Sequence, residues 1–152
     1  MAKVGILMGS TSDLEVMKNC ETYLNWFGIE SETHVISAHR NPDQCADFVK
    51  SAEENGFSVL IGGAGMAAHL PGVMASFTTL PIIGVPLEGS ALNGVDALHS
   101  IVQMPAGVPV ATVAIGKAGA RNAAVLAAQI IGIGNSSVKA KLKEFKAMGC
   151  KL

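Results

Sequence analysis

The sequence predicts an α/β fold built around a central parallel sheet, and two observations support this prediction. Short apolar segments alternate five times with segments of helical periodicity along the 152 residues. The apolar segments are continuous runs, which is typical of parallel strands that helices bury on both faces. Right-handed crossovers between such strands produce a three-layer, flavodoxin-like sandwich, and the length fits one domain spanning residues 1–152.

Each predicted strand is a short apolar run that ends near a glycine or another turn residue. The predicted strands cover residues 4–8, 33–36, 59–61, 81–85 and 110–115.

The predicted helices have apolar residues at helical spacing and clear start signals. The first helix should take Ser12 or Asp13 as its N-cap, and the second should begin at Pro42 with Ser37 or Asn41 as its cap. The predicted helices cover residues 13–27, 42–52, 67–77, 95–102, 118–131 and, at the C-terminal end, 137–148.

The composition limits the partners that this chain can have. Its formal net charge is −1, so it has no basic field and nucleic acid is not an expected partner. Residues 59–87 contain no Asp, Glu, Lys or Arg, yet glycines and prolines interrupt them too often for a membrane span. Because only 15% of the residues are charged, we expect the domain to bury part of its surface in a homo-oligomer.

The three cysteines indicate a reducing, cytoplasmic location. Cys20, Cys45 and Cys150 show no CxxC spacing, and the start of the chain runs into a strand pattern with no secretory leader. Neither Cys20 nor Cys45 has a nearby histidine in a nucleophile pattern, so both are expected to pack within helices.

In this architecture three loops converge at the carboxyl ends of neighbouring strands, where ligands bind in open α/β sheets. The first loop brings Ser10, Ser12 and Asp13 to the start of a helix. Backbone N–H groups and serine hydroxyls there can hold a phosphate, and Asp13 can accept hydrogen bonds from ribose hydroxyls. The alternative is plain capping of the helix by Ser12 or Asp13.

The second loop is the segment Ser37-Ala38-His39-Arg40-Asn41-Pro42. It places His39 beside Arg40, and an imidazole next to a fixed cation suits proton transfer on an anionic substrate. The alternative is a turn and a helix N-terminus with His39 merely exposed.

The third loop, residues 62–72, is rich in glycine and carries His69. Glycines let the backbone approach a small ligand closely. Residues 63–68 match G-x-G-x-x-A, with Glu88 at a suitable distance for a ribose contact, but the motif follows the third strand, which argues against a dinucleotide fold. The four histidines lack metal-ligand spacing, so no metal is expected, and His34 and His99 should pack or lie on the surface.

Taken together, the three loops resemble one family, the N5-carboxyaminoimidazole ribonucleotide mutases of purine biosynthesis (PurE). The matching blocks follow one another in order from Val4 to about Ile131. Two positions depart from the commonest family pattern, Asn41, where Thr is frequent, and Met66, where Gly is frequent. The main blocks are Met8-Gly9-Ser10-Thr11-Ser12-Asp13, Ser37-Ala38-His39-Arg40-Asn41-Pro42, Ala67-Ala68-His69-Leu70-Pro71-Gly72 and Ser100-Ile101-Val102-Gln103-Met104-Pro105.

The resemblance implies a flavodoxin-like subunit of an octamer that works without a metal or an organic cofactor. It also implies that the substrate is a small ribonucleotide, whose N5-carboxylate moves to C4 with His39 as the acid and base. The implied substrate-binding residues are Ser10, Ser12 and Asp13 for phosphate and ribose, Arg40 for the phosphate, Ser37, Ala38, Ala64 and Gly65 around the ring and migrating carboxylate, and His69 and Leu70 at the wall that retains CO2.

Two other hypotheses remain open from the sequence. An aminoimidazole ribonucleotide carboxylase would share the fold but use free CO2, and such relatives typically have Lys after the histidine, where this chain has Arg40. A non-catalytic nucleotide-binding module would explain the serine-rich and glycine-rich loops, but not why His39 and Arg40 stand together.

Overall fold

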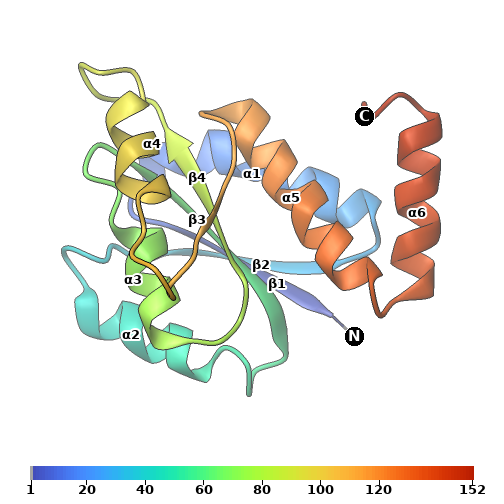
Figure 1. Ribbon diagram of the computed structural model, residues 1–152, viewed down its shortest axis with the longest axis horizontal. Coiled ribbons are helices and arrows are strands. Elements are labelled where there is room, and N and C mark those ends of the chain that lie inside the picture. The colour runs from blue at the N-terminus through green and yellow to red at the C-terminus, as the bar shows by residue number, and fades with distance from the viewer. Residues whose placement is uncertain (1) are drawn as a thin grey trace.

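A computed structural model describes residues 2–152, and its central feature is a parallel sheet between layers of helices (Figure 1). The strands lie in the order β2-β1-β3-β4-β5, and every neighbouring pair is parallel. The prediction of an α/β, flavodoxin-like sandwich is therefore confirmed. The elements are β1 (Lys3–Met8), the 3-10 helix η1 (Thr11–Asp13), α1 (Leu14–Trp26), β2 (Glu30–Val35), α2 (Pro42–Ser51), β3 (Phe57–Gly65), α3 (Leu70–Phe77), β4 (Ile82–Leu87), α4 (Val95–Val102), β5 (Ala111–Thr112), α5 (Lys117–Gly132) and α6 (Ser136–Ala147).

Alternate residues of the strands supply two separate hydrophobic cores, one on each face of the sheet. In β1, Val4, Ile6 and Met8 belong to the core that α1, α5 and α6 cover. Leu7, between them, belongs to the core under α2, α3 and α4, which lie together on the other side of the sheet (Figure 1). Burial on both faces explains why the strands are continuously apolar.

β3 is longer than predicted, because residues 62–65 continue the strand instead of forming a loop. Gly62 pairs in register with Leu7 on one side and with Gly84 on the other. A Cβ atom on Gly62 would lie 2.9 Å from the sulfur of Met74, and one on Gly63 would collide with Met17. These glycines thus let side chains of α1 and α3 pack directly onto the strand.

β5 is shorter than predicted, with regular pairing only at Ala111 and Thr112. As the edge strand it pairs with β4 alone, although the Val113 N–H still donates to the Gly84 carbonyl at 3.1 Å. The chain then turns at Gly116, whose φ of +75° favours glycine, to begin α5.

The last helix, α6, starts where Asn135 caps it by accepting hydrogen bonds from the N–H groups of Ser137 and Val138. Its Phe145 is buried against aromatic rings of α1, including Tyr23. The sequence predicted this helix but not the surface on which it packs. Within residues 2–152, no helix is long and apolar enough to cross a membrane.

Candidate active site

A pocket of about 480 Å³ opens at the carboxyl ends of β1, β2 and β3. These strands are neighbours in the order β2-β1-β3, so the loops that follow them meet at one edge of the sheet. The structure brings together around this pocket all of the site residues that the sequence indicated. They are Ser10, Ser12, Asp13, Ser37, Ala38, His39, Arg40, Ala64, Gly65, His69 and Leu70.

In the first loop, Asp13 is the N-cap residue of α1, as one alternative predicted, but the side-chain capping hydrogen bond is made by Ser10 at the start of η1. The Ser10 Oγ accepts a hydrogen bond from the Ser12 N–H at 3.3 Å and lies 2.9 Å from the Ser12 Oγ. Asp13 occupies the N-cap position of α1 with a helical backbone, and its carboxylate makes no capping hydrogen bond. The short 3-10 turn before α1 is the reason, and it leaves the Asp13 carboxylate at the pocket. Partial burial there raises the pKa of Asp13.

In the second loop, Ser37 organises the turn that presents His39 and Arg40. The Arg40 N–H donates to the Ser37 Oγ at 3.2 Å, and the Asn41 N–H donates to the Ser37 carbonyl at 2.8 Å. Asn41 is the N-cap residue of α2, as one alternative predicted, but its side chain makes no capping hydrogen bond. Among residues 2–152, no carboxylate forms an ion pair with Arg40, so its guanidinium is available to an anionic ligand.

The most distinctive contact in the pocket joins the second and third loops. The Nε2 atom of His39 lies 2.6 Å from the Nδ1 atom of His69, and the two rings are nearly perpendicular at 85°. One nitrogen must donate and the other accept, so a single proton is held between two imidazoles. An arrangement of this kind can deliver a proton to a ligand or receive one from it.

The pocket also contains residues that sequence reasoning missed or undervalued. Glu88 and Gly89, directly after β4, contribute to its wall. Only the weak G-x-G-x-x-A motif pointed to Glu88. Met66 is 62% exposed and has a φ of +56°, a region that favours glycine and explains why a non-glycine residue is unusual here.

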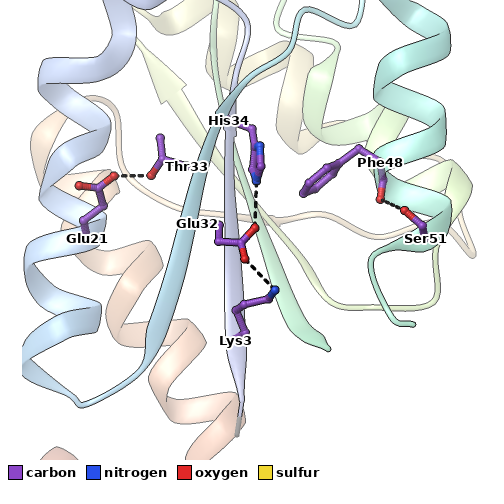
Figure 2. A network of polar contacts seen from close by, with 7 residues as sticks. All are labelled: Lys3, Glu21, Glu32, Thr33, His34, Phe48 and Ser51. Carbon is purple, nitrogen blue, oxygen red and sulfur yellow. Dashed lines mark hydrogen bonds and ion pairs between the residues drawn. The ribbon is translucent and has the colours of Figure 1, made fainter. Parts of the chain in front are cut away.

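The other titratable residues considered from the sequence lie away from this pocket. Cys20 and Cys45 are buried free thiols on α1 and α2, as expected, and burial raises the pKa of Cys20 to about 12. His34 packs its ring against Phe48 at a centroid distance of 4.5 Å (Figure 2). His99 is exposed on α4. Within the described chain, no three His, Cys, Asp or Glu side chains cluster as metal ligands would.

Fold and pocket together define a class: a flavodoxin-like α/β protein whose carboxyl-edge pocket combines a free arginine with a pair of histidines. Comparison with known proteins narrows this class. The chain belongs to the AIR carboxylase family, whose sequence pattern matches residues 3–150. The family resemblance inferred from the three loops is therefore confirmed.

Individual relatives are similar over nearly the whole chain. The N5-carboxyaminoimidazole ribonucleotide mutase of Vibrio cholerae is 56% identical over 144 residues, which cover 95% of this chain and 89% of that protein. The protein of the same name from Thermotoga maritima is 57% identical over 146 residues, covering 96% and 84%. The crystal structure of Treponema denticola PurE superimposes with a TM-score of 0.88 at 28% identity, covering 99% of this chain and 92% of that one.

Proposed function

We propose that this chain is a mutase that converts N5-carboxyaminoimidazole ribonucleotide into 4-carboxy-5-aminoimidazole ribonucleotide. The observation that carries the proposal is the contact between His39 and His69 in a pocket that also contains the free Arg40. Relatives that are more than half identical and bear the name of this activity support it.

The first half of the proposed reaction removes the carboxylate from nitrogen. The bond between N5 and the carboxylate carbon breaks, its electron pair stays on nitrogen, and CO2 is released into the pocket. His39 protonates the nitrogen as the bond breaks, which prevents a full negative charge from developing there. His69, whose Nδ1 lies 2.6 Å from the Nε2 of His39, holds the His39 imidazole in place while it gives up this proton and stays neutral until the second half of the reaction.

The second half attaches the same CO2 to carbon. The electron-rich C4 atom of the ring attacks the carbon of CO2, which forms the new C–C bond. His39, now a base, removes the proton from C4 and returns to its starting state. The reaction is a redox-neutral isomerisation and requires no redox cofactor, and we propose that it proceeds without a metal or an organic cofactor.

Binding of the substrate is assigned to the three loops. Arg40 pairs with the phosphate, and the hydroxyls of the first loop with Asp13 hold phosphate and ribose. Ala64 and Gly65, at the end of β3, bring backbone close to the ring. The remaining residues assigned to the substrate are Ser10 and Ser12 for the phosphate, Ser37 and Ala38 beside the ring, and His69 and Leu70 at the wall that retains CO2.

We further propose that the chain forms one domain over residues 1–152 and acts in the cytoplasm as a homo-octamer. Apolar side chains that remain exposed in the isolated chain support self-association. Among them are Met66 at the pocket and Leu92, each 62% exposed. Neither nucleic acid nor a membrane is a proposed partner.

The test is a quenched reaction with synthetic N5-carboxyaminoimidazole ribonucleotide in buffer free of bicarbonate, comparing the wild type with His39→Asn. Conversion to the C4-carboxylate by the wild type alone is the expected result. If the wild type reacts only when aminoimidazole ribonucleotide and bicarbonate are supplied, the chain is a carboxylase. Binding of the ribonucleotide without turnover in either assay would identify a binding module.

A further inference from the structure

A second cavity, of about 380 Å³, lies between α1, α5 and α6 and shares no residue with the carboxyl-edge pocket. One face of α5 lines it, with Ala118, Asn122, Val125 and Gln129 at helical spacing. The other lining residues are Tyr23 of α1, Arg121 of α5, Leu142, Phe145 and Lys146 of α6, and Cys150 and Lys151 beyond it.

Packing of α6 onto α1 and α5 shapes this cavity. A short turn joins α5 to α6 (Figure 1), and at the end of α5 a Cβ on Gly132 would lie 2.9 Å from Leu142. Phe145 lies against the rings of Tyr23 and Phe27, with centroid distances of 5.9 and 5.3 Å. These contacts hold α6 in place, so the cavity is a built feature of the fold.

The inner part of the cavity is aromatic and contains one unsatisfied polar group. Tyr23 is only 9% exposed and Phe145 only 4%. The Tyr23 hydroxyl has no hydrogen-bond partner among residues 2–152. Its oxygen is not sealed off, because the one sealed and unpaired side-chain oxygen in the described chain belongs to Asp96. A buried hydroxyl that is unpaired but reachable from a cavity favours a polar ligand atom there.

The charges around the cavity are all positive. Arg121, Lys146 and Lys151 line it, and among the residues that the structure describes no Asp or Glu does. The Arg121 Nε donates to the Asn19 Oδ1 at 3.1 Å, which fixes the guanidinium while leaving its terminal amino groups to a ligand. Within residues 2–152, none of these three cations forms an ion pair. An anionic group is the complement of such a rim.

We propose that this cavity binds a mononucleotide. The flat base would lie between the partly exposed apolar side chains of Val125 and Leu142, with an edge at the Tyr23 hydroxyl, which can donate a hydrogen bond to a ring nitrogen or accept one from an amino group. The carboxamides of Asn122 and Gln129 each offer a donor and an acceptor, the pair of functions that an adenine edge requires. The phosphate would meet the cationic rim. The cavity volume lies within the range of sites for small molecules. This inference does not depend on the proposed mutase activity.

Cys150 provides a local reporter for the test. It is exposed and lines the cavity, whereas Cys20 and Cys45 are fully buried, so a thiol reagent such as dithionitrobenzoate should react with Cys150 in the native protein. Adenosine 5′-monophosphate should slow this reaction about tenfold at about ten times its dissociation constant. Adenosine, which lacks the phosphate, and ribose 5-phosphate, which lacks the base, should protect far less.

Variants separate this cavity from the carboxyl-edge pocket. Arg121→Gln and Lys146→Gln should each raise the half-protecting concentration of the nucleotide about tenfold. Lys143→Gln is the matched control, because Lys143 lies on α6 but does not line the cavity, and its half-protecting concentration should equal that of the wild type. Arg40→Gln, in the other pocket, should also leave protection unchanged.

Several results would overturn the proposal. Protection that is lost in Arg40→Gln but retained in Arg121→Gln would place the nucleotide in the carboxyl-edge pocket. Equal protection by adenosine would show that the cationic rim has no role. A Cys150 thiol that is unreactive without any nucleotide would show that another copy of the chain covers the cavity. If millimolar adenosine 5′-monophosphate does not protect the Cys150 thiol, the cavity does not bind a mononucleotide.

Discussion

His34 and His39 are only five residues apart, but the structure gives them opposite surroundings. His34 lies within β2, with its Nε2 3.3 Å from a carboxylate oxygen of Glu32, whose other oxygen contacts the Lys3 Nζ at 2.8 Å (Figure 2). Its ring rests on Phe48. His39 lies beyond the end of that strand, in the pocket, and its Nε2 meets a second imidazole, that of His69.

The difference shows how surroundings decide what the same side chain can do. Glu32 and Phe48 fix both the position of the His34 ring and the acceptor for its proton. The pair formed by His39 and His69 joins two chemically equal nitrogen bases, so the proton between them can be given to a ligand and regained. We therefore assign structural stabilisation to the first cluster and acid–base chemistry to the second.

The strongest test of this comparison exchanges each histidine for asparagine. His39→Asn should lower kcat about 10³-fold, because it removes the group that gives and takes the proton. His34→Asn should leave kcat within about twofold of the wild type, since His34 does not line the pocket. Steady-state kinetics on both variants measures the contrast. Similar losses in the two variants would remove the distinction between the clusters.

The next test concerns the partner in the pair. His69→Asn should lower kcat about 10- to 100-fold, less than His39→Asn, because His39 remains but loses the imidazole that holds its ring in position. KM should change little in comparison. Single-turnover measurements check this order, and a loss as large as that of His39→Asn would mean that His69 itself acts on the substrate.

A variant of Arg40 tests whether the positive charge of this side chain serves substrate binding or the chemical step. Arg40→Gln should raise KM about tenfold with a smaller change in kcat, because a charge-assisted contact with the phosphate is lost in the ground state and the transition state alike. Lys50→Gln, a loss of the same charge on α2 outside the pocket, is the control and should behave as the wild type. A fall in kcat with KM unchanged would contradict the assignment.

The smallest expected effect belongs to the cluster around His34. The hydrogen bond from Lys3 lowers the pKa of Glu32 from 4.5, so the ionised carboxylate stabilises the folded state. This stabilisation is complete above pH 4.5 and is lost as the pH falls through the lower pKa of the folded state. Glu32→Gln should therefore reduce the free energy of unfolding by less than about 1 kcal/mol at neutral pH, with screening by solvent limiting the effect.

Urea denaturation at neutral pH and again near pH 3 measures that difference. The difference between the wild type and Glu32→Gln should be smaller at the lower pH, and turnover should be unaffected at neutral pH. A difference of the same size at both pH values would show that the side chain acts through packing instead of charge.

Most of the fold could be predicted because its elements are separated by clear local signals. The helix predicted at residues 95–102 has the bounds that the structure shows, and Pro42 begins α2 as expected. The extension of β3 could not be predicted. Glycine is required there because the side chains of Met17 and Met74, on helices distant in sequence, leave no room for a Cβ atom. From the sequence alone, consecutive glycines indicate a loop.

In the candidate site, too, some features could be predicted from the sequence and others could not. The segments could be assigned to one edge of the sheet because parallel strands place their carboxyl ends together. The 2.6 Å contact between His39 and His69, by contrast, depends on how two loops 30 residues apart are oriented. The capping role of Ser10 was also missed, because a 3-10 turn precedes α1 and takes Ser10 as its own N-cap.

The position of β2 at the edge of the sheet has a consequence for solubility. β2 pairs only with β1, which leaves the hydrogen-bonding groups along its other side open to strand addition by a further chain. Glu30 and Glu32 lie on this strand, and a second copy adding in parallel would bring like charges side by side. Charge at this edge of the sheet therefore opposes aggregation by strand addition.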